Sequence, residues 1–312
     1  MLNFLFLILM LLISIAYLTL LERKILSYMQ LRKGPNKVGF MGLLQPFSDG
    51  IKLFFKEQVN LIFFNYFIYM LSPIFMFMIS MFIWSIYPFL WNLLNLNYGF
   101  LFFLCCSSLS VYGLLLCGWS SNSNFALLGS LRAVAQVISY EVSLVMIIIC
   151  LMIFSFSFNL MNLMIYQYYI WFLFFSFPLF FCWLSTCLAE VNRAPFDFAE
   201  GESELVSGFN IEYGGGGFAL IFLAEYGNII IMSFMTSMFF LGCDIYSFIF
   251  YVKCILISFW FIWVRSTLPR FRYDKLMYLT WSVFLPLSLN YFIFFIGFLF
   301  LMITGTYFII LG

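Results

Sequence analysis

The sequence predicts an all-α polytopic membrane protein, and three observations support this prediction. Of its 312 residues, 65% are apolar and 9% are charged, whereas soluble proteins average about 25% charged residues. The apolar residues form eight long runs close to the roughly 20 residues that a helix needs to cross a bilayer. Nearly all basic residues fall between these runs on one side. This composition excludes both a soluble fold and a disordered chain.

We expect a single membrane domain over residues 1–312, with about eight transmembrane helices and one interfacial amphipathic helix. The expected spans are about 2–21, 61–90, 100–119, 134–154, 168–189, 218–241, 248–264 and 276–301. Three of them contain a proline, which predicts a kink or an early helix end because proline lacks an amide N–H. These prolines are Pro73, Pro88, Pro178 and Pro286.

The basic residues predict an orientation in the membrane. Thirteen of the 14 lie in the loops after the first, third, fifth and seventh spans, and Lys253 is near the other side. Basic loops of a membrane protein stay on the side from which it is inserted. We therefore expect these loops on the inner face and both termini on the opposite face.

The segment 43–58 predicts the interfacial amphipathic helix. Leu43, Phe47, Ile51 and Phe54 share one helical face, and charged residues mark the other. Such a helix lies in the membrane interface with its apolar face in the lipid. An ordinary connecting helix packed on its neighbours is the alternative.

Several kinds of site have no sequence support. Histidine is absent, which excludes histidine-dependent catalysis and histidine-ligated metals. The eight cysteines form no CxxC pair and are interpreted as packing residues. No nucleotide-binding glycine motif occurs, and the glycines at 214–217 are interpreted as a flexible link. We expect no metal, cluster or nucleotide site in this chain, and no nucleic-acid partner.

Two glutamates inside the predicted spans are the most informative charges. Glu141 and Glu225 each lie seven residues into a span from the basic side, roughly 10 Å below that face. A carboxylate inside a bilayer costs on the order of 3 kcal/mol, so two at matched depth predict a shared polar cavity and a proton relay. A buried ion pair with Arg132 or with a partner subunit is the alternative. The neighbouring Tyr140 and Tyr226 would extend the relay or serve as packing residues.

Further acidic residues gather at the same face. Glu22 and Glu190 end the first and fifth spans, and the loop 190–217 is rich in carboxylates. The run Glu200–Glu204 contains three negative charges, which we interpret as part of an ordered, ion-paired funnel beneath another protein. A solvated tract and an oxygen-ligated cation site are the alternatives.

Two segments resemble a known family. Residues 32–39 read RKGPNKVG, with Gln45-Pro46 and Asp49 following, and residues 189–206 read AEVNRAPFDFAEGESELV. Both resemble signature segments of NADH-ubiquinone oxidoreductase chain 1, the quinone-site membrane subunit of respiratory complex I. Residues 268–274, LPRFRYD, are similar to a third marker. The resemblance covers essentially the whole chain.

This resemblance implies a multi-pass subunit of the mitochondrial inner membrane, with basic loops on the matrix side and both termini on the intermembrane-space side. Ubiquinone is the implied substrate, and FMN, iron–sulfur clusters and NADH are bound by other subunits. The implied partners are the quinone-site hydrophilic subunits, the membrane-arm subunits and the lipid bilayer. The chain then contributes to an H⁺-translocating NADH:ubiquinone reductase without a redox centre or a complete active site of its own.

The resemblance also implies roles for individual residues. The ubiquinone tunnel would be lined by Arg23, Asp49, Lys52 and Phe222. The proton relay would comprise Glu22, Tyr140, Glu141, Glu190, Asp197, Glu202, Glu204, Glu212 and Glu225. These negative charges would be balanced by Arg132, Arg193, Arg265 and Arg270.

Three other functions fit parts of the sequence. One is a stand-alone proton-coupled transporter or channel, which predicts internal repeats or interrupted helices, and no convincing repeat is apparent. Another is the homologous subunit of a membrane-bound hydrogenase, which passes electrons to protons. The third is a structural scaffold, which leaves the carboxylates at matched depth unexplained.

Overall fold

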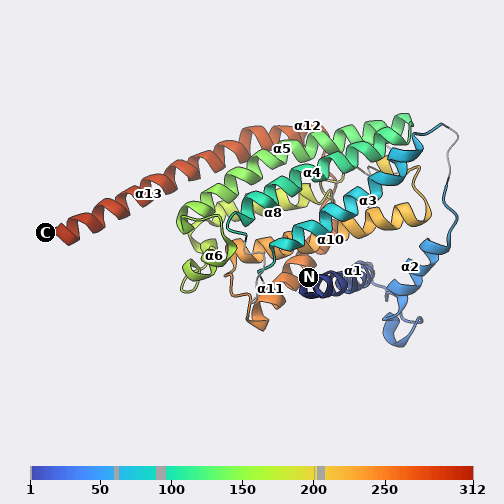
Figure 1. Ribbon diagram of the computed structural model, residues 1–312, viewed down its shortest axis with the longest axis horizontal. Coiled ribbons are helices and arrows are strands. Elements are labelled where there is room, and N and C mark those ends of the chain that lie inside the picture. Colours follow the sequence, from blue (N-terminus) through green and yellow to red (C-terminus); the bar gives the residue numbers. More distant parts are fainter. Residues whose placement is uncertain (1, 60–62, 89–95, 200, 202–207, 312) are drawn as a thin grey trace.

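The computed structural model describes residues 2–59, 63–88, 96–199, 201 and 208–311, and it consists of helices joined by loops (Figure 1). Over these residues there is no β-strand, so the predicted all-α class is confirmed. Within the same ranges, seven helices are long and apolar enough to cross a membrane. These helices confirm the predicted class of polytopic membrane protein. A helix can cross lipid because it satisfies its backbone hydrogen bonds internally.

The long helices form the body of the molecule. They are α1 (Leu2–Met29), α3 (Tyr66–Ile83), α4 (Gly99–Ser120), α5 (Asn124–Ser155), α10 (Gly215–Phe240), α11 (Phe248–Thr267) and α13 (Leu285–Leu311). The shorter elements connect or extend them. They are η1 (Phe40–Gly42), α2 (Gln45–Phe55), η2 (Trp84–Ile86), α6 (Leu160–Tyr166), α7 (Phe172–Phe175), α8 (Phe177–Glu190), η3 (Gly208–Asn210), α12 (Tyr273–Leu279) and the π-helical turn η4 (Thr280–Phe284).

The fifth expected span differs most from the prediction. In place of one helix over 168–189, α7 and α8 are separated at Ser176, whose φ of −132° and ψ of 44° are not helical. Pro178 lies in the first turn of α8, where the missing N–H has no partner to lose. With 14 residues, α8 is shorter than the other apolar helices, and its role as an eighth span stays a prediction.

The other prolines act in three ways. Pro73 lies inside α3 without ending it. Pro88 follows η2, so the helical part of the second expected span stops before it. Pro286 is the second residue of α13, just beyond the π-helical turn η4, and a π turn is one of the irregularities that bend a helix.

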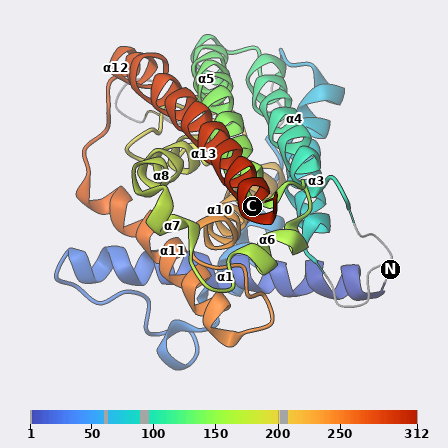
Figure 2. The same cartoon turned by 90° about the vertical axis from the view of Figure 1, so that its left-hand side faces the viewer.

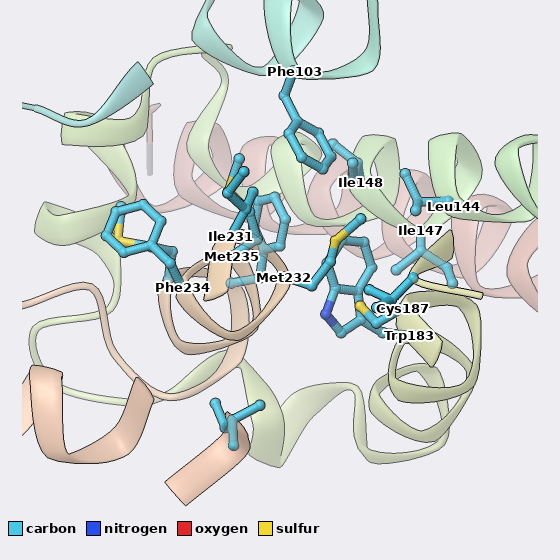
Figure 3. Close-up of a cluster of buried hydrophobic side chains, with 14 of the residues drawn as sticks. Phe103, Leu144, Ile147, Ile148, Trp183, Cys187, Ile231, Met232, Phe234 and Met235 are labelled. Atoms are coloured by element: carbon cyan, nitrogen blue, oxygen red, sulfur yellow. The ribbon is translucent and has the colours of Figure 1, made fainter. Parts of the chain in front are cut away.

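Helix α10 has a central position in the bundle. Helices α1, α3 and α11 pack against α10, and α5 packs on α4, α8 and α13. Helix α1 crosses the others, since it is seen nearly end-on in Figure 1 and lengthwise in Figure 2. The core between α4, α5, α8 and α10 is apolar, with Phe103, Leu144, Trp183 and Met232 among its buried side chains (Figure 3).

Helix α2 lies at the outside of the bundle and contains no buried residue. Phe47, Ile51 and Phe54 of this helix are exposed. An exposed apolar face on a short helix is typical of a segment in the membrane interface. The interfacial position of α2 stays a prediction that its exposure supports.

The glycines at 214–217 were expected to form a flexible link, but they lead directly into α10, which begins at Gly215. Gly215 has a φ of +58°, and a Cβ there would lie 3.2 Å from the carbonyl oxygens of Lys56 and Glu57. Glycine therefore allows the start of α10 to approach the end of α2 closely.

Candidate functional site

Glu22 of α1 lies in a buried ion-pair cluster. This residue is only 4% exposed. The Tyr226 hydroxyl donates to its Oε2 at 2.7 Å, while its Oε1 contacts Nη1 of Arg265 and lies 3.5 Å from Nη1 of Arg193. We call these four residues the Glu22 cluster. They come from α1, α10, α11 and the loop after α8, and the crossing of α1 over α10 and α11 brings them together.

Arg193 supplies a permanent positive charge to this cluster. Its guanidinium carbon lies 4.6 Å from the centre of the Tyr226 ring, which is a cation–π distance. Burial lowers the pKa of Arg193, but Glu22, Tyr226 and Glu225 together outweigh burial, and the net pKa lies above its ordinary value. Arg193 therefore stays protonated throughout the physiological pH range.

A cavity beside the Glu22 cluster contains two carboxylates, those of Glu190 and Glu225. Its space of about 30 Å³ has room for about two water molecules. We call it the acidic cavity. Its other polar lining residues are Ser80, Ser110, Asn192 and Asn228. Glu190 is 8% exposed, and its Oε2 has no hydrogen-bond partner among the described residues.

The sequence predicted that Glu141 and Glu225 share a cavity, but the structure pairs Glu225 with a different carboxylate. Glu190 lines it with Glu225, whereas Glu141 does not line it. Glu141 is half-buried on α5, close enough to Glu190 for an electrostatic interaction between the two carboxylates. Depth along a helix fixes the height of a side chain but not the direction in which it points, so the matched depth alone could not select the pair.

Two polar residues of α5, Gln136 and Tyr140, precede Glu141 on the same helix. Gln136 donates through Nε2 to the carbonyl oxygens of Ala189 at 3.0 Å and Phe196 at 2.7 Å, which holds the end of α8 against α5. Tyr140 is fully buried, and its hydroxyl has no hydrogen-bond partner within the described part of the chain. Its ring packs on Phe196, so the contacts of Tyr140 are those of a packing residue.

The four residues expected at the ubiquinone tunnel lie near the junction of α1, α2 and α10. Arg23 of α1 pairs with Asp49 of α2 at 2.5 Å. Phe222 of α10 packs against Phe218, and Lys52 is exposed on the last turn of α2. Arg23 follows Glu22 directly, so this junction adjoins the Glu22 cluster.

The remaining expected residues are dispersed around these sites. Arg270 lies 3.6 Å from Asp197 in a half-buried ion pair. Arg132 is half-buried on α5. The backbone oxygen of Glu212 accepts a hydrogen bond of 2.7 Å from the Tyr69 hydroxyl. Glu202 and Glu204, which are also expected in the relay, lie outside the described residues.

Three polar residues at the site were not predicted: Gln136, Asn192 and Asn228. Each is an uncharged amide, and two of them lie within apolar helices. A buried amide must find hydrogen-bond partners, so an amide inside an apolar run could have indicated a polar site. The charged glutamates indicated such a site more strongly than the uncharged amides.

Metal ligation has no geometric support in the part of the chain that the structure describes. No group of three or more Cys, Asp or Glu residues there could hold a metal ion. All eight cysteines are free, and most are buried. Cys117, for example, has its sulfur 3.6 Å from that of Met76, which is a packing contact.

Comparisons with known proteins give a consistent result. The family model described as NADH dehydrogenase matches residues 2–296. A mosquito protein from Anopheles gambiae, NADH-ubiquinone oxidoreductase chain 1, is 61% identical, and the match covers 94% of this chain and 93% of that protein. The chain belongs to the NADH-ubiquinone oxidoreductase chain 1 family. The resemblance found in the signature segments is thereby confirmed.

Other members of the chain 1 family match over the same extent. The protein of the locust Locusta migratoria is 62% identical over 95% of this chain and 94% of its own length. That of the whale Balaenoptera physalus is 50% identical over 93% of both chains. Family membership therefore applies to the helices and to the loops that contain the Glu22 cluster and the acidic cavity.

Proposed function

We propose that this chain, as a membrane subunit of respiratory complex I, helps to form the ubiquinone tunnel and couples ubiquinone reduction to proton translocation. The relatives are named NADH-ubiquinone oxidoreductase chain 1, which favours an NADH-linked and quinone-linked enzyme over the hydrogenase and transporter alternatives. Electrons reach ubiquinone from an iron–sulfur cluster of another subunit. NADH, FMN and the clusters stay with those subunits, and this chain acts on protons.

The observation that supports coupling is a continuous series of buried and half-buried charges across the bundle. Glu22 pairs with Arg193, and Arg193 interacts electrostatically with Glu225. Glu225 shares the acidic cavity with Glu190. Glu190 in turn interacts electrostatically with Glu141 on α5, so the series connects α1, the loop after α8, α10, α8 and α5.

One end of this series adjoins the proposed ubiquinone tunnel. The Arg23–Asp49 pair joins α1 to α2 immediately beside Glu22, and α2 has the exposed apolar face that a lipid-soluble substrate would meet. Reduction of ubiquinone takes up protons along with electrons, and protons withdrawn from neighbouring protein groups change the charge of those groups near this end. A changed charge alters proton binding at a neighbouring carboxylate, and that change passes along the series.

The proposed place of the protein is the mitochondrial inner membrane, with the basic loops in the matrix and both termini on the other side. The positions of the helix ends support helices that cross the membrane in alternating directions. The N-terminal ends of α3, α5 and α10 lie together with the C-terminal end of α4 (Figure 1). The backbone N–H of Asn65 donates to the carbonyl oxygen of Ser120 at 3.1 Å, which joins the start of α3 to the end of α4.

Substitution of Glu141 by glutamine tests the proposal. Glu141→Gln keeps the shape and removes the exchangeable charge, and a loss of about 3 kcal/mol at one coupled step slows turnover roughly a hundredfold. We expect NADH:ubiquinone reductase activity and proton pumping to fall together while the complex still assembles. The matched control is Glu57→Gln, which changes an exposed carboxylate at the end of α2. Full activity and pumping in Glu141→Gln would remove that residue from the relay.

A further inference from the structure

A groove opens beside α1 at the end of the bundle away from the Glu22 cluster. Helix α1 packs on α10 at Ile15, whose Cδ1 lies 3.7 Å from the place that a Cβ on Gly227 would take. Helices that cross at an angle, as α1 does here (Figures 1 and 2), touch over a short stretch and diverge beyond it. Toward the N-terminal end of α1, this divergence leaves a cavity of about 430 Å³ between α1, η2, α10 and α11. We call this cavity the α1 groove.

The walls of the α1 groove are largely apolar. Its inner side includes the buried residues Leu11, Trp84 and Phe234. At its open side, Phe6 and Met10 of α1 are exposed. Because α1 is long and apolar enough to cross a membrane, this open side faces hydrocarbon. Water does not fill an apolar cavity, and an empty one forfeits packing contacts along all of its walls. The groove therefore requires an apolar occupant.

Polar side chains gather at one end of the α1 groove. Tyr87, just after η2, and Tyr251, in the first turn of α11, share a hydrogen bond of 2.6 Å between their hydroxyls. Asn3 is at the start of α1. Further in, the hydroxyl of Ser14 donates to the carbonyl oxygen of Leu11 at 2.7 Å and so is satisfied within its own helix. Tyrosine is enriched where lipid headgroups meet hydrocarbon, so the groove runs from the membrane surface into the hydrocarbon layer.

The volume of the α1 groove distinguishes between two kinds of apolar occupant. A cavity of about 150 Å³ accommodates the six carbons of benzene, so 430 Å³ has room for about 17 carbon atoms. A fatty acyl chain of ordinary length has about that many. A helix with its side chains is about 10 Å across, so the same volume would hold only about one of its turns. The groove thus fits a single hydrocarbon chain and not a helix of another subunit.

We propose that the α1 groove binds one acyl chain of a phospholipid, with the glycerol and phosphate of that lipid beside Tyr87 and Tyr251. Within this tyrosine pair one hydroxyl donates to the other, and Tyr251 is 41% exposed, so its phenol can also reach an ester or phosphate oxygen. The bound chain fills the space where α1 diverges from the bundle and thereby supports the crossing that assembles the Glu22 cluster. Met10 precedes Arg23 by 13 residues on α1, roughly 20 Å along the helix, so this site is separate from the proposed ubiquinone tunnel.

Density maps of the intact complex, purified in detergent, test the site. The unsubstituted complex should show a chain in the groove that leads to a phosphate-bearing headgroup beside Tyr251. Met10→Trp places an indole in the groove, and we expect it to lose this lipid. Leu9→Trp is the matched control, because Leu9 is the neighbouring exposed residue of α1 and does not line the groove. It should keep the lipid. Tyr251→Phe should keep the chain and lose the ordered headgroup.

Several results would overturn the inference. An empty groove, a groove filled by a helix or side chain of another subunit, or density that leads to a quinone ring would each exclude a phospholipid site. A detergent tail that no phospholipid displaces when phosphatidylcholine is added back would do the same. Loss of the lipid from Leu9→Trp as well as from Met10→Trp would show that it does not depend on the groove. An unchanged headgroup in Tyr251→Phe would remove the role of the tyrosine pair. If Met10→Trp does not assemble, the map of the unsubstituted complex decides the question. None of these results bears on proton coupling, so the proposed function is tested separately.

Discussion

The C-terminal end and the middle of α10 differ in how they accommodate buried polar groups. Where the helix stops, Gln167 satisfies its backbone. The Nε2 of Gln167 donates to the carbonyl oxygens of Met238 at 3.0 Å and Phe239 at 2.9 Å. Its Oε1 accepts from the N–H of Gly242 at 2.9 Å. Carbonyls at a helix end have no partner inside the helix, so this amide replaces hydrogen bonds that the helix cannot make.

Lys253 completes the same end, which we call the capped end. Its Nζ donates to the carbonyl oxygen of Leu241 at 2.6 Å and lies 4.2 Å from the centre of a Trp171 ring. A cation at a helix C-terminus is favourable to the helix dipole, and the aromatic face adds a cation–π contact. Lys253, the basic residue that stood apart in the sequence, thus has a structural explanation.

The middle of α10, around Glu225 and Asn228, retains charges and unpaired oxygens. It adjoins the Glu22 cluster and the acidic cavity, where buried acceptors of Glu190, Asn192 and Asn228 have no partner among the described residues. The apolar core of Figure 3 lies along α10 toward the capped end. Polar groups arranged for stability are paired, as at the capped end. The proposed function expects this difference, with stability as the role of the capped end and proton transfer as the role of the middle of α10.

Removal of the central carboxylate should have the largest effect on stability. Glu22→Gln leaves Arg193 and Arg265 without their shared partner, and Arg193 is 12% exposed at its side chain. Breaking a buried ion pair by removing one partner costs about 3–5 kcal/mol. We expect a strong loss of assembled complex on a native gel and faster thermal inactivation of what remains.

The double variant Glu22→Gln with Arg193→Gln shows whether the unpaired charge is the cause. Removing the buried cation should restore part of the assembled complex, because neither partner then stays buried alone. Asp274→Asn is the matched control. The side chains of Asp274 and its partner Arg272 are 72% and 78% exposed, and such surface ion pairs contribute little to stability. Equal losses in the control and in Glu22→Gln would contradict the argument.

The capped end should respond to substitution by losing stability alone. Gln167→Leu removes three hydrogen bonds and leaves buried backbone groups without partners, which costs about 2 kcal/mol. We expect earlier thermal inactivation but an unchanged ratio of protons pumped to NADH oxidised at low temperature. A fall in that ratio would show that the capped end and the middle of α10 are not functionally distinct.

The sequence predicted the helices well because long apolar runs leave few alternatives in a membrane. It also predicted that buried glutamates would matter. It could not select their partners, since Arg265 lies 243 residues from Glu22 along the chain and meets it only because α1 crosses α11. Glu190, and not the predicted Glu141, lines the cavity with Glu225 for a similar reason. Packing between helices sets the direction in which a side chain points, and depth along the helix does not. The amides were missed because they have no charge.

The pair between α1 and α2 should show the smallest effect on stability and separate substrate binding from folding. Arg23 and Asp49 are 50% and 34% exposed at their side chains, so Asp49→Asn should cost less than about 1 kcal/mol. If this junction lines the ubiquinone tunnel, the same substitution should raise the KM for ubiquinone several-fold without changing thermal inactivation. Lys56→Gln, an exposed change just after α2, is the control. A raised KM in both variants would indicate a general effect of surface charge, whereas a normal KM in Asp49→Asn would place the tunnel elsewhere. Because Asn keeps the shape of the side chain and one acceptor, a selective rise would be due to the charge facing Arg23.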